Sequence, residues 1–194
     1  MKRVGIFGGS FDPVHKGHVA VAESFLASGA IDLLWVMLTP YPPHKQEAEQ
    51  LSYSHRLNML KLAFKNSRQI QISTLEKELP APSYTYKTIT ALQKEHPDTA
   101  FFLCLGEDSI AHFNKWYKYR KILDRVSILV AERPGWDHRS VAPEILEQAI
   151  FVDHEPVDLA SSDIRLKKKG SDLEFSVPIQ VLDYIRKHQL YETA

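Results

Sequence analysis

Cysteine is almost absent from this sequence of 194 residues, and the one that is present, Cys104, has no partner for an internal disulfide. A chain without disulfides is typical of a reducing compartment. Cys104 stands inside the apolar stretch "FFLCLG", and a thiol among such neighbours is more often packed in a core than used as a nucleophile. We therefore expect a buried thiol and no cysteine chemistry.

Long hydrophobic runs and an excess of charge are also lacking. The longest apolar run, "LLWVML", is far shorter than the roughly 18 residues that suggest a membrane-spanning helix. Glycines interrupt the short apolar stretch at the start, which is not the pattern of a signal peptide. Lys and Arg number 24, as do Asp and Glu, so no overall basic field favours nucleic acid, although a local basic pocket stays compatible with this balance. We expect a cytoplasmic protein that binds neither a membrane nor nucleic acid.

The chain alternates between strand-like and helix-like segments. Its length suits one well-buried core, so we expect a single domain over residues 1–194. Continuous apolar runs are typical of strands covered on both faces. The pattern predicts an α/β fold, a Rossmann-like doubly wound parallel sheet of five or six βα units. Strands are expected at 3–7, 31–40, 70–74, 100–106 and 127–135, and helices at 18–29, 55–66, 82–96, 116–126, 143–150 and 178–191.

The stretch "GIFGGSFDPVHKGH" follows the first predicted strand. Gly8 and Gly9 lack a Cβ, so a backbone N–H can approach a bulky anion there, and the helix N-terminus that follows favours phosphate. The loop matches neither G-x-G-x-x-G nor the P-loop. The glycines alone do not decide between two interpretations, a phosphate cradle and a tight turn with two surface histidines.

The two histidines favour the cradle. His15 and His18 are three residues apart, which places both on one face of a helix, and Gly17 between them removes side-chain bulk. Paired imidazoles can donate hydrogen bonds to a phosphoryl transition state. Zinc is the competing interpretation, but the sequence offers no third ligand in a recognisable motif and no cysteine pair. We therefore expect no metal held by the protein side chains.

Two motifs carry a resemblance to a known family. "GGSFDPVHKGH" resembles the signature of the nucleotidyltransferases with an H-x-G-H motif, and "LASSDIR" (159–165) resembles their I-S-S-T-x-I-R motif, with Asp163 in place of threonine. The stretches "PPHK", "RLNMLKLA", "PSYTYKT", "LGEDSIAHFNKWYKY" and "ERPG" extend the resemblance over most of the chain, and the closest match is the bacterial nicotinate mononucleotide adenylyltransferase family. Lys87, where that family often has Asp, and Glu107, where a small residue is common, depart from the pattern.

The resemblance implies transfer of AMP from ATP to nicotinate mononucleotide, giving nicotinate adenine dinucleotide and pyrophosphate in NAD biosynthesis. It implies that His15 and His18 are catalytic and that Mg²⁺ is bound mainly through the ATP phosphates. The implied ATP-binding residues are Gly8, Gly9, Ser10, Phe11, His15, His18, Gly106, Asp108, Ser161, Ser162, Ile164 and Arg165. The implied residues of the mononucleotide site are Lys45, Thr85, Trp116, Tyr117 and Arg133.

Some of these roles have structural alternatives. Asp108 faces the adenosine ribose or caps a helix, and Trp116 stacks on the pyridine ring or belongs to an aromatic core cluster. Lys45 and Arg133 lie near the mononucleotide or are solvated loop charges. Asp12 and Pro13 are expected to shape the turn, without Asp12 acting as a base.

Three other functions compete with this one. A superfamily member with another acceptor, such as phosphopantetheine, or a cytidylyltransferase shares the first motif, but "LASSDIR" and "KWY" favour the nicotinate enzyme. A fragment of a class I aminoacyl-tRNA synthetase would carry a similar histidine motif, but this chain is too short for an anticodon-binding domain. A non-enzymatic ATP sensor needs no paired histidines. Whether the chain forms a homo-oligomer is left open by the sequence.

Overall fold

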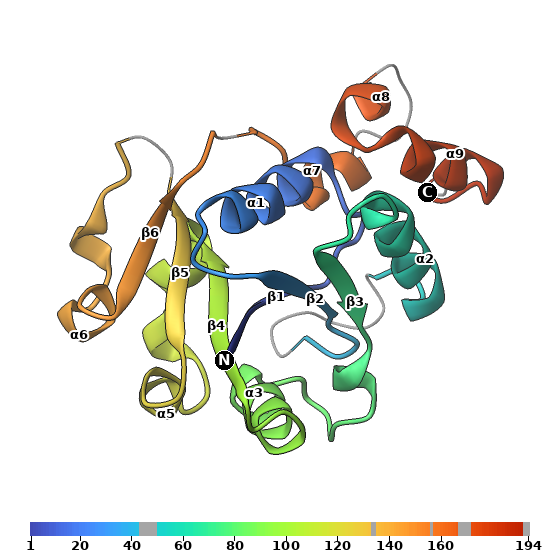
Figure 1. Cartoon of the computed structure of the whole chain (residues 1–194). Coiled ribbons are helices and arrows are strands. Elements are labelled where there is room, and N and C mark those ends of the chain that lie inside the picture. Colours follow the sequence, from blue (N-terminus) through green and yellow to red (C-terminus); the bar gives the residue numbers. More distant parts are fainter. Residues whose placement is uncertain (43–49, 133–134, 156, 167–171, 192–194) are drawn as a thin grey trace.

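A parallel sheet forms the centre of the protein. The computed structural model describes residues 1–42, 50–132, 135–155, 157–166 and 172–191. In these residues six strands pair in the order β3-β2-β1-β4-β5-β6, each parallel to its neighbours (Figure 1). The strands are β1 (Lys2–Gly9), β2 (Leu33–Leu38), β3 (Ile70–Ser73), β4 (Thr99–Gly106), β5 (Ser127–Glu132) and β6 (Ala149–Asp153). The predicted doubly wound α/β fold is confirmed.

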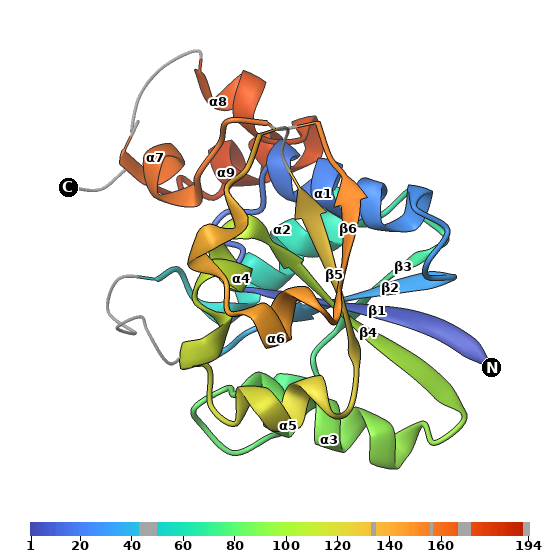
Figure 2. The ribbon, with the colours of Figure 1, turned by 90° about the vertical axis from the view of Figure 1, so that its left-hand side faces the viewer.

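Helices cover both faces of the sheet, as Figures 1 and 2 show. On one face, α1 (Lys16–Ala27), α2 (Tyr53–Phe64) and α9 (Ile179–Lys187) enclose a core that contains Phe25 and Leu60. On the other face, α3 (Thr85–Glu95) and α5 (Tyr119–Leu123) enclose a second core around Ile89 and Ile122. The shorter helices are α4 (Glu107–Ala111), α6 (Pro143–Leu146), α7 (Ser161–Leu166) and α8 (Asp172–Ser176), with 3₁₀ turns at Leu75–Lys77, Phe113–Lys115 and His138–Ser140.

Two helix predictions in the C-terminal half are wrong in extent. The segment 143–150 is helical only in α6, and from Ala149 the chain forms β6, which pairs with β5 and buries Val152. The segment 116–126 is helical only in α5, because Trp116 is extended (φ −72°, ψ 146°) and Lys118 is left-handed (φ 57°). Trp116 therefore lies on the connection between the 3₁₀ turn Phe113–Lys115 and α5, and the direction of its side chain is not set by helical spacing.

The strand order defines where a ligand can bind. From β1 the chain proceeds outward to β2 and β3, and it then crosses back to β4 on the opposite side of β1. Sheets of this kind bind ligands outside the carboxyl ends of the strands at such a reversal point. The ends of β1 and β4 are therefore the expected location of the site. Cys104 on β4 is 1% exposed, and burial raises the pKa of its thiol, as expected of a core residue.

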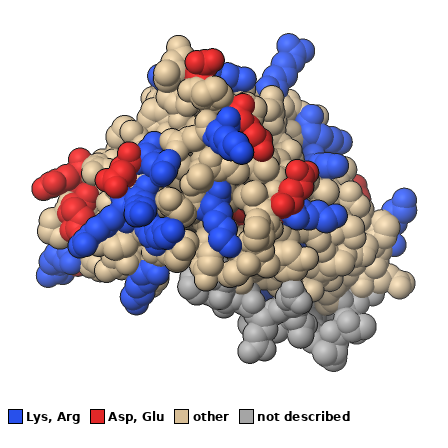
Figure 3. Space-filling view, turned by 90° about the horizontal axis from the view of Figure 1, so that it is seen from below, with Lys and Arg blue, Asp and Glu red and all other residues tan. Residues whose placement is uncertain are grey.

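The surface carries both signs of charge. On the face in Figure 3, basic and acidic side chains lie among one another. In the part of the chain that the structure describes, no helix has the length and apolar character needed to span a membrane.

Candidate active site

Glycines border a crevice where β1 and β4 end. A Cβ placed on Gly8 or Gly106 would meet no other atom within 4 Å, so the backbone at both positions faces open space and allows close approach of a ligand. Gly9 differs, because a Cβ there would lie 2.9 Å from the ring of Phe11. Phe11 has a left-handed backbone (φ 45°) and a buried ring. The glycines thus serve two purposes: two open the crevice, and one makes room for the loop's own aromatic ring.

His15 and His18 are held together by a reciprocal capping box. His15 is the N-cap of α1, and its Nδ1 accepts from the His18 backbone N–H at 3.4 Å, while the His15 N–H donates to His18 Nδ1 at 3.2 Å. The rings stack with centroids 3.7 Å apart. Because α1 begins at Lys16, the cap brings the pair together, rather than the helical spacing that the sequence suggested.

This arrangement sets the tautomer of the rings. A neutral imidazole whose Nδ1 accepts a hydrogen bond carries its proton on Nε2. Burial lowers the pKa of His15 to about 4, so His15 is neutral near pH 7. A ring in this tautomer can donate from Nε2 to an anion while its Nδ1 keeps the hydrogen bond to the backbone.

Gly17 fits against the first ring. A Cβ at Gly17 would lie 3.0 Å from His15 Nδ1 and 3.5 Å from the Val157 carbonyl oxygen. A side chain there would require the imidazole to shift by a few tenths of an ångström. The lack of a side chain at Gly17, which the sequence suggested as a removal of bulk, therefore makes room for the His15 ring.

A buried arginine on α2, which the sequence analysis did not identify, anchors the loop after β1. Arg56 is 2% exposed and donates from Nη1 to the Ser10 carbonyl at 2.8 Å and to the Thr39 carbonyl at 3.0 Å. It thereby joins the chain just after β1 to the chain just after β2. Burial lowers the pKa of Arg56, an effect that the nearby charge of Asp12 opposes. The sequence could have indicated the burial of Arg56, because it stands one turn before Met59 on the same face of α2.

The second motif packs against the first. Ser161 Oγ donates to the Pro13 carbonyl at 3.0 Å, and Arg165 Nη1 donates to the Asp12 carbonyl at 2.7 Å. Ile164 is buried in the core cluster that also contains Phe11 and Val14 of the loop after β1. Ser162 is exposed, and its hydroxyl donates to Asp163 Oδ1 at 3.4 Å. Two segments separated by most of the chain thus form one wall.

These walls enclose a cavity of about 550 Å³, here called the histidine cavity. Its lining combines the loop after β1, the start of α4 and the second motif. The predicted ATP-binding residues that line it are Gly8, Gly9, Ser10, Phe11, His15, His18, Gly106, Asp108, Ser161, Ser162 and Arg165. The structure therefore brings together every member of that set except Ile164, which does not line the cavity.

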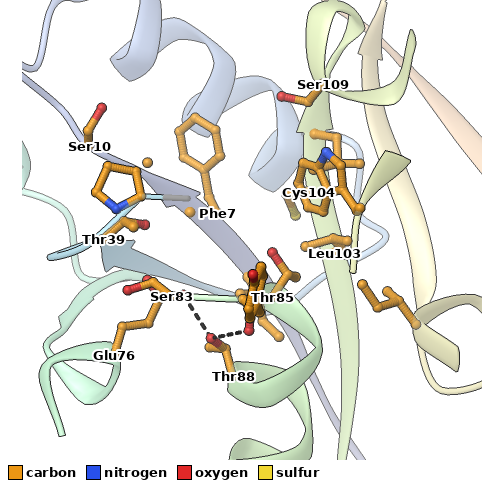
Figure 4. A pocket seen from close by; sticks show the side chains of 18 of the residues that line it. Phe7, Ser10, Thr39, Glu76, Ser83, Thr85, Thr88, Leu103, Cys104 and Ser109 are labelled. Carbon is orange, nitrogen blue, oxygen red and sulfur yellow. Dashed lines mark hydrogen bonds between the residues drawn. The ribbon is translucent and has the colours of Figure 1, made fainter. Parts of the chain in front are cut away.

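A second cavity of about 530 Å³, here called the tryptophan cavity, is also lined by the ends of β1 and β4 (Figure 4). Thr85, Trp116 and Tyr117 line it. Thr85 is the first residue of α3, where backbone N–H groups lack partners within the helix. Trp116 lines the cavity and also packs on Phe113, with ring centroids 5.2 Å apart, so it belongs to an aromatic cluster, and its stacking on a pyridine ring stays a prediction. The two cavities share Phe7, Gly8, Gly9, Ser10, Gly106 and Ser109.

Comparison with known proteins identifies the family. A model of the cytidylyltransferase-like family matches residues 6–167. Over its full length the chain is 33% identical to the full-length nicotinate-nucleotide adenylyltransferase of Bacillus subtilis (strain 168). The chain belongs to the nicotinate-nucleotide adenylyltransferases of this family. It is also 35% identical over 191 residues to a probable nicotinate-nucleotide adenylyltransferase of Streptococcus pneumoniae serotype 4, covering 98% of the chain and 89% of that protein.

The fold has a close counterpart among solved structures. The nicotinic acid mononucleotide adenylyltransferase of Plasmodium falciparum, complexed with NaAD, superposes with a TM-score of 0.83. The match covers 100% of this chain and 99% of that one at 23% identity. At this identity the likeness establishes the shared fold.

The departures from the adenylyltransferase pattern lie differently relative to the cavities. Glu107 lines the histidine cavity, whereas Lys87 lines neither cavity, and its ammonium donates to the Pro80 carbonyl at 3.2 Å.

Asp108 is exposed in the first turn of α4, and Gly106 is the N-cap, so the alternative prediction that Asp108 caps the helix is wrong. Lys45 and Arg133 lie outside the described residues.

Glu76 is a further residue of the tryptophan cavity that the sequence analysis did not identify. Its side chain is 6% exposed, and Oε1 accepts from the Thr88 hydroxyl at 2.8 Å, as Figure 4 shows. Oε2 is buried without a hydrogen-bond partner. Burial raises the pKa of the carboxyl, against the opposing influence of the Thr88 and Thr39 hydroxyls. Sequence gives no local signal for it, since it looks like one of several charges in "LEKEL".

Proposed function

We propose that the protein transfers AMP from ATP to nicotinate mononucleotide and releases pyrophosphate. The observation that carries the proposal is the meeting of two cavities at the ends of β1 and β4. One presents paired Nε2–H donors beside bare glycine backbone, and the other presents an aromatic ring beside a helix N-terminus. Two substrates bound in these cavities would bring their reacting atoms together at the shared border.

The chemistry follows from the donors. A phosphate oxygen of the mononucleotide attacks the α-phosphorus of ATP, and the bond from that phosphorus to the oxygen bridging to the β-phosphate breaks. Pyrophosphate leaves with the electron pair. His15 and His18 donate from Nε2 to the oxygens on which charge accumulates, which is the interaction that accelerates such a step. The attacking phosphate is already ionised, so no general base or covalent enzyme intermediate is needed.

The tryptophan cavity suits a flat ring that carries a carboxylate. Trp116 provides the stacking surface. The backbone N–H groups of Thr85 and Tyr117 provide donors, and the positive end of the α3 dipole adds to them. Lys45 and Arg133, which lie outside the described residues, stay predictions as cations near the mononucleotide.

On the ATP side, we assign the ribose to Gly106 and Asp108, and the leaving phosphates to Ser161, Ser162 and Arg165. The described residues contain no group of three or more His, Cys, Asp or Glu side chains that could hold a metal. We propose that Mg²⁺ arrives on the ATP phosphates and neutralises part of their charge. The use of ATP is also the support for a cytoplasmic location.

Pyrophosphate release tests the proposal directly. The assay supplies ATP with nicotinate mononucleotide, nicotinamide mononucleotide or phosphopantetheine, and repeats the best pair with CTP. We expect the highest kcat/KM for ATP with nicotinate mononucleotide. Preference for phosphopantetheine or CTP would reject the proposed substrates, and absence of turnover with every pair would reject the enzymatic function.

A further inference from the structure

The C-terminal turn contacts the loop after β1 through a part-buried hydrogen bond. The Tyr191 hydroxyl donates to Asp12 Oδ1 at 2.7 Å, across 179 positions of sequence. Asp12 is 1% exposed, so its carboxylate is almost wholly shielded from water. Burial and the adjacent charge of Asp12 both raise the pKa of the Tyr191 phenol, which keeps it a neutral donor.

The chain adopts an unusual conformation to make this contact. After α9 ends, Gln189 and Tyr191 are both left-handed, with φ of 49° and 64°. Such backbone is uncommon for residues other than glycine, and packing must maintain it. Leu190 between them is 7% exposed, and its N–H donates to the Ile185 carbonyl at 3.0 Å. The turn therefore buries one side chain and directs the next hydroxyl toward Asp12.

Asp12 connects that hydroxyl to the rest of the site. Its Oδ2 accepts from the Leu51 N–H at 3.2 Å, and its backbone carbonyl accepts from Arg165 Nη1 at 2.7 Å. Asp12 does not line either cavity, so it has no direct place for a substrate. It stands three residues before His15, the N-cap on which the imidazole pair depends. A movement of Asp12 would be passed directly to the loop that carries the Nε2–H donors.

We infer that Tyr191 is a positioning residue for adenylyl transfer, because its hydroxyl fixes Asp12 and, through it, the loop that carries His15 and His18. The inference rests on the proposed function. Loss of the hydroxyl would leave a buried carboxylate oxygen unpaired, and the loop would shift to relieve it. Misplacement of catalytic groups by about 1 Å can cost about 100-fold in rate, so we expect about a tenfold fall in kcat from the smaller shift.

Tyr191→Phe is the test variant, and Tyr184→Phe is its matched control. Tyr184 is also a tyrosine of the C-terminal region, and its hydroxyl has partners on α2, namely His55 Nδ1 at 3.0 Å and Asn58 Nδ2 at 3.0 Å. We expect Tyr191→Phe to lower kcat about tenfold while the KM for nicotinate mononucleotide stays within twofold. Tyr184→Phe should keep kcat within twofold of the wild type. Equal losses in both variants would show a general effect of the C-terminal region and overturn the inference.

A double-mutant cycle with Asp12→Ala, which removes the acceptor of the Tyr191 hydroxyl, tests the route of the effect. If Tyr191 acts through Asp12, adding Tyr191→Phe to Asp12→Ala should lower kcat less than twofold further. A full tenfold further loss would mean that Tyr191 acts by another route, contrary to the inference.

A readout without turnover separates this inference from the proposed function. The ¹⁵N-labelled imidazoles of the wild type and Tyr191→Phe are compared by NMR, with and without the non-hydrolysable analogue adenosine 5′-(α,β-methylene)triphosphate. Changed His15 and His18 signals in Tyr191→Phe, but not in Tyr184→Phe, support the inference whatever the acceptor substrate is. Unchanged signals together with wild-type kcat overturn it, whereas a wild type inactive with nicotinate mononucleotide rejects only the proposed function.

Discussion

His15 and His18 each accept a hydrogen bond from the backbone N–H of the other, and their rings stack 3.7 Å apart. A capping box normally stabilises only the start of a helix. Here the two side chains of the box are also the donors at the proposed reaction centre. The stability of α1 and the geometry of catalysis therefore depend on the same pair of contacts.

Replacing either histidine with alanine should reduce kcat by about 10²–10³, the cost of losing one preorganised donor at a developing charge. His15→Ala should also lower the free energy of unfolding by about 1 kcal/mol, because the N-cap is lost. Steady-state kinetics and urea denaturation measure the two effects. If both alanine variants keep kcat within tenfold of the wild type, the imidazoles do not stabilise the transition state.

The His15 imidazole should stay neutral and carry its proton on Nε2 until the pH falls to about 4. In the unfolded chain a histidine takes up a proton near pH 6.5. Since the folded pKa is the lower one, stability from this residue is present above about pH 6.5 and is lost as pH falls toward 4. A ¹H–¹⁵N NMR titration of the free protein checks both statements, and an inflection of the His15 signals near pH 6.5 would contradict them.

Trp116→Ala should weaken use of nicotinate and nicotinamide mononucleotides in parallel, because stacking hardly senses the ring substituent. The wild type should prefer the acid by about 10²-fold, since backbone donors at Thr85 and Tyr117 match a carboxylate and mispair with an amide NH₂. The measurement is kcat/KM for both acceptors.

Trp136→Ala serves as the control for Trp116, because Trp136 packs on His138 and Phe151 and lines neither cavity. It should leave the ratio of the two kcat/KM values and each KM near wild type. A Trp116 variant that reverses the acid preference would show that the side chain, rather than the backbone, selects the substituent.

Glu76→Gln should stabilise the protein at pH 8 by about 1 kcal/mol, because a buried carboxylate with one oxygen lacking a hydrogen-bond partner is replaced by a neutral group of the same shape. Burial raises the folded pKa of Glu76 above its unfolded value, so the wild type loses stability as pH rises through these two pKa values. The gain should therefore shrink toward pH 4. Exposed Glu78 provides the control, and a Glu78→Gln gain equal to that of Glu76→Gln would contradict the assignment.

Much of the fold could be predicted from the sequence, because local residue patterns identify most of its strands and helices. Apolar runs and βα alternation identify the strands β1 to β5, and the first loop follows from its glycines and histidines. β6 was missed because the stretch "PEILEQAI" has helical spacing that pairing with β5 overrides from Ala149 onward. The shortness of α5 was missed because a left-handed Lys118 leaves no trace in composition.

The residues that pack around the site were harder to predict than the residues of the site itself. Arg56, Glu76 and Tyr191 act through contacts with segments far away in the sequence, and such contacts follow from the packed fold. The reciprocal capping of His15 and His18 depends on where α1 begins, and helix starts are uncertain by a residue or more from sequence. The motif therefore identified the residues, and the fold determined their partners.

The border between the two cavities has a consequence for how this architecture changes its acceptor. Three of the six residues shared by the cavities, Gly8, Gly9 and Gly106, bring no side chains to that border, so main chain of two adjacent strands forms a large part of it. Thr85, Trp116 and Tyr117 stand beyond the border, on the far side from the histidines. A related enzyme with other residues in place of these three could accept a different phosphate ester and keep the same transfer step.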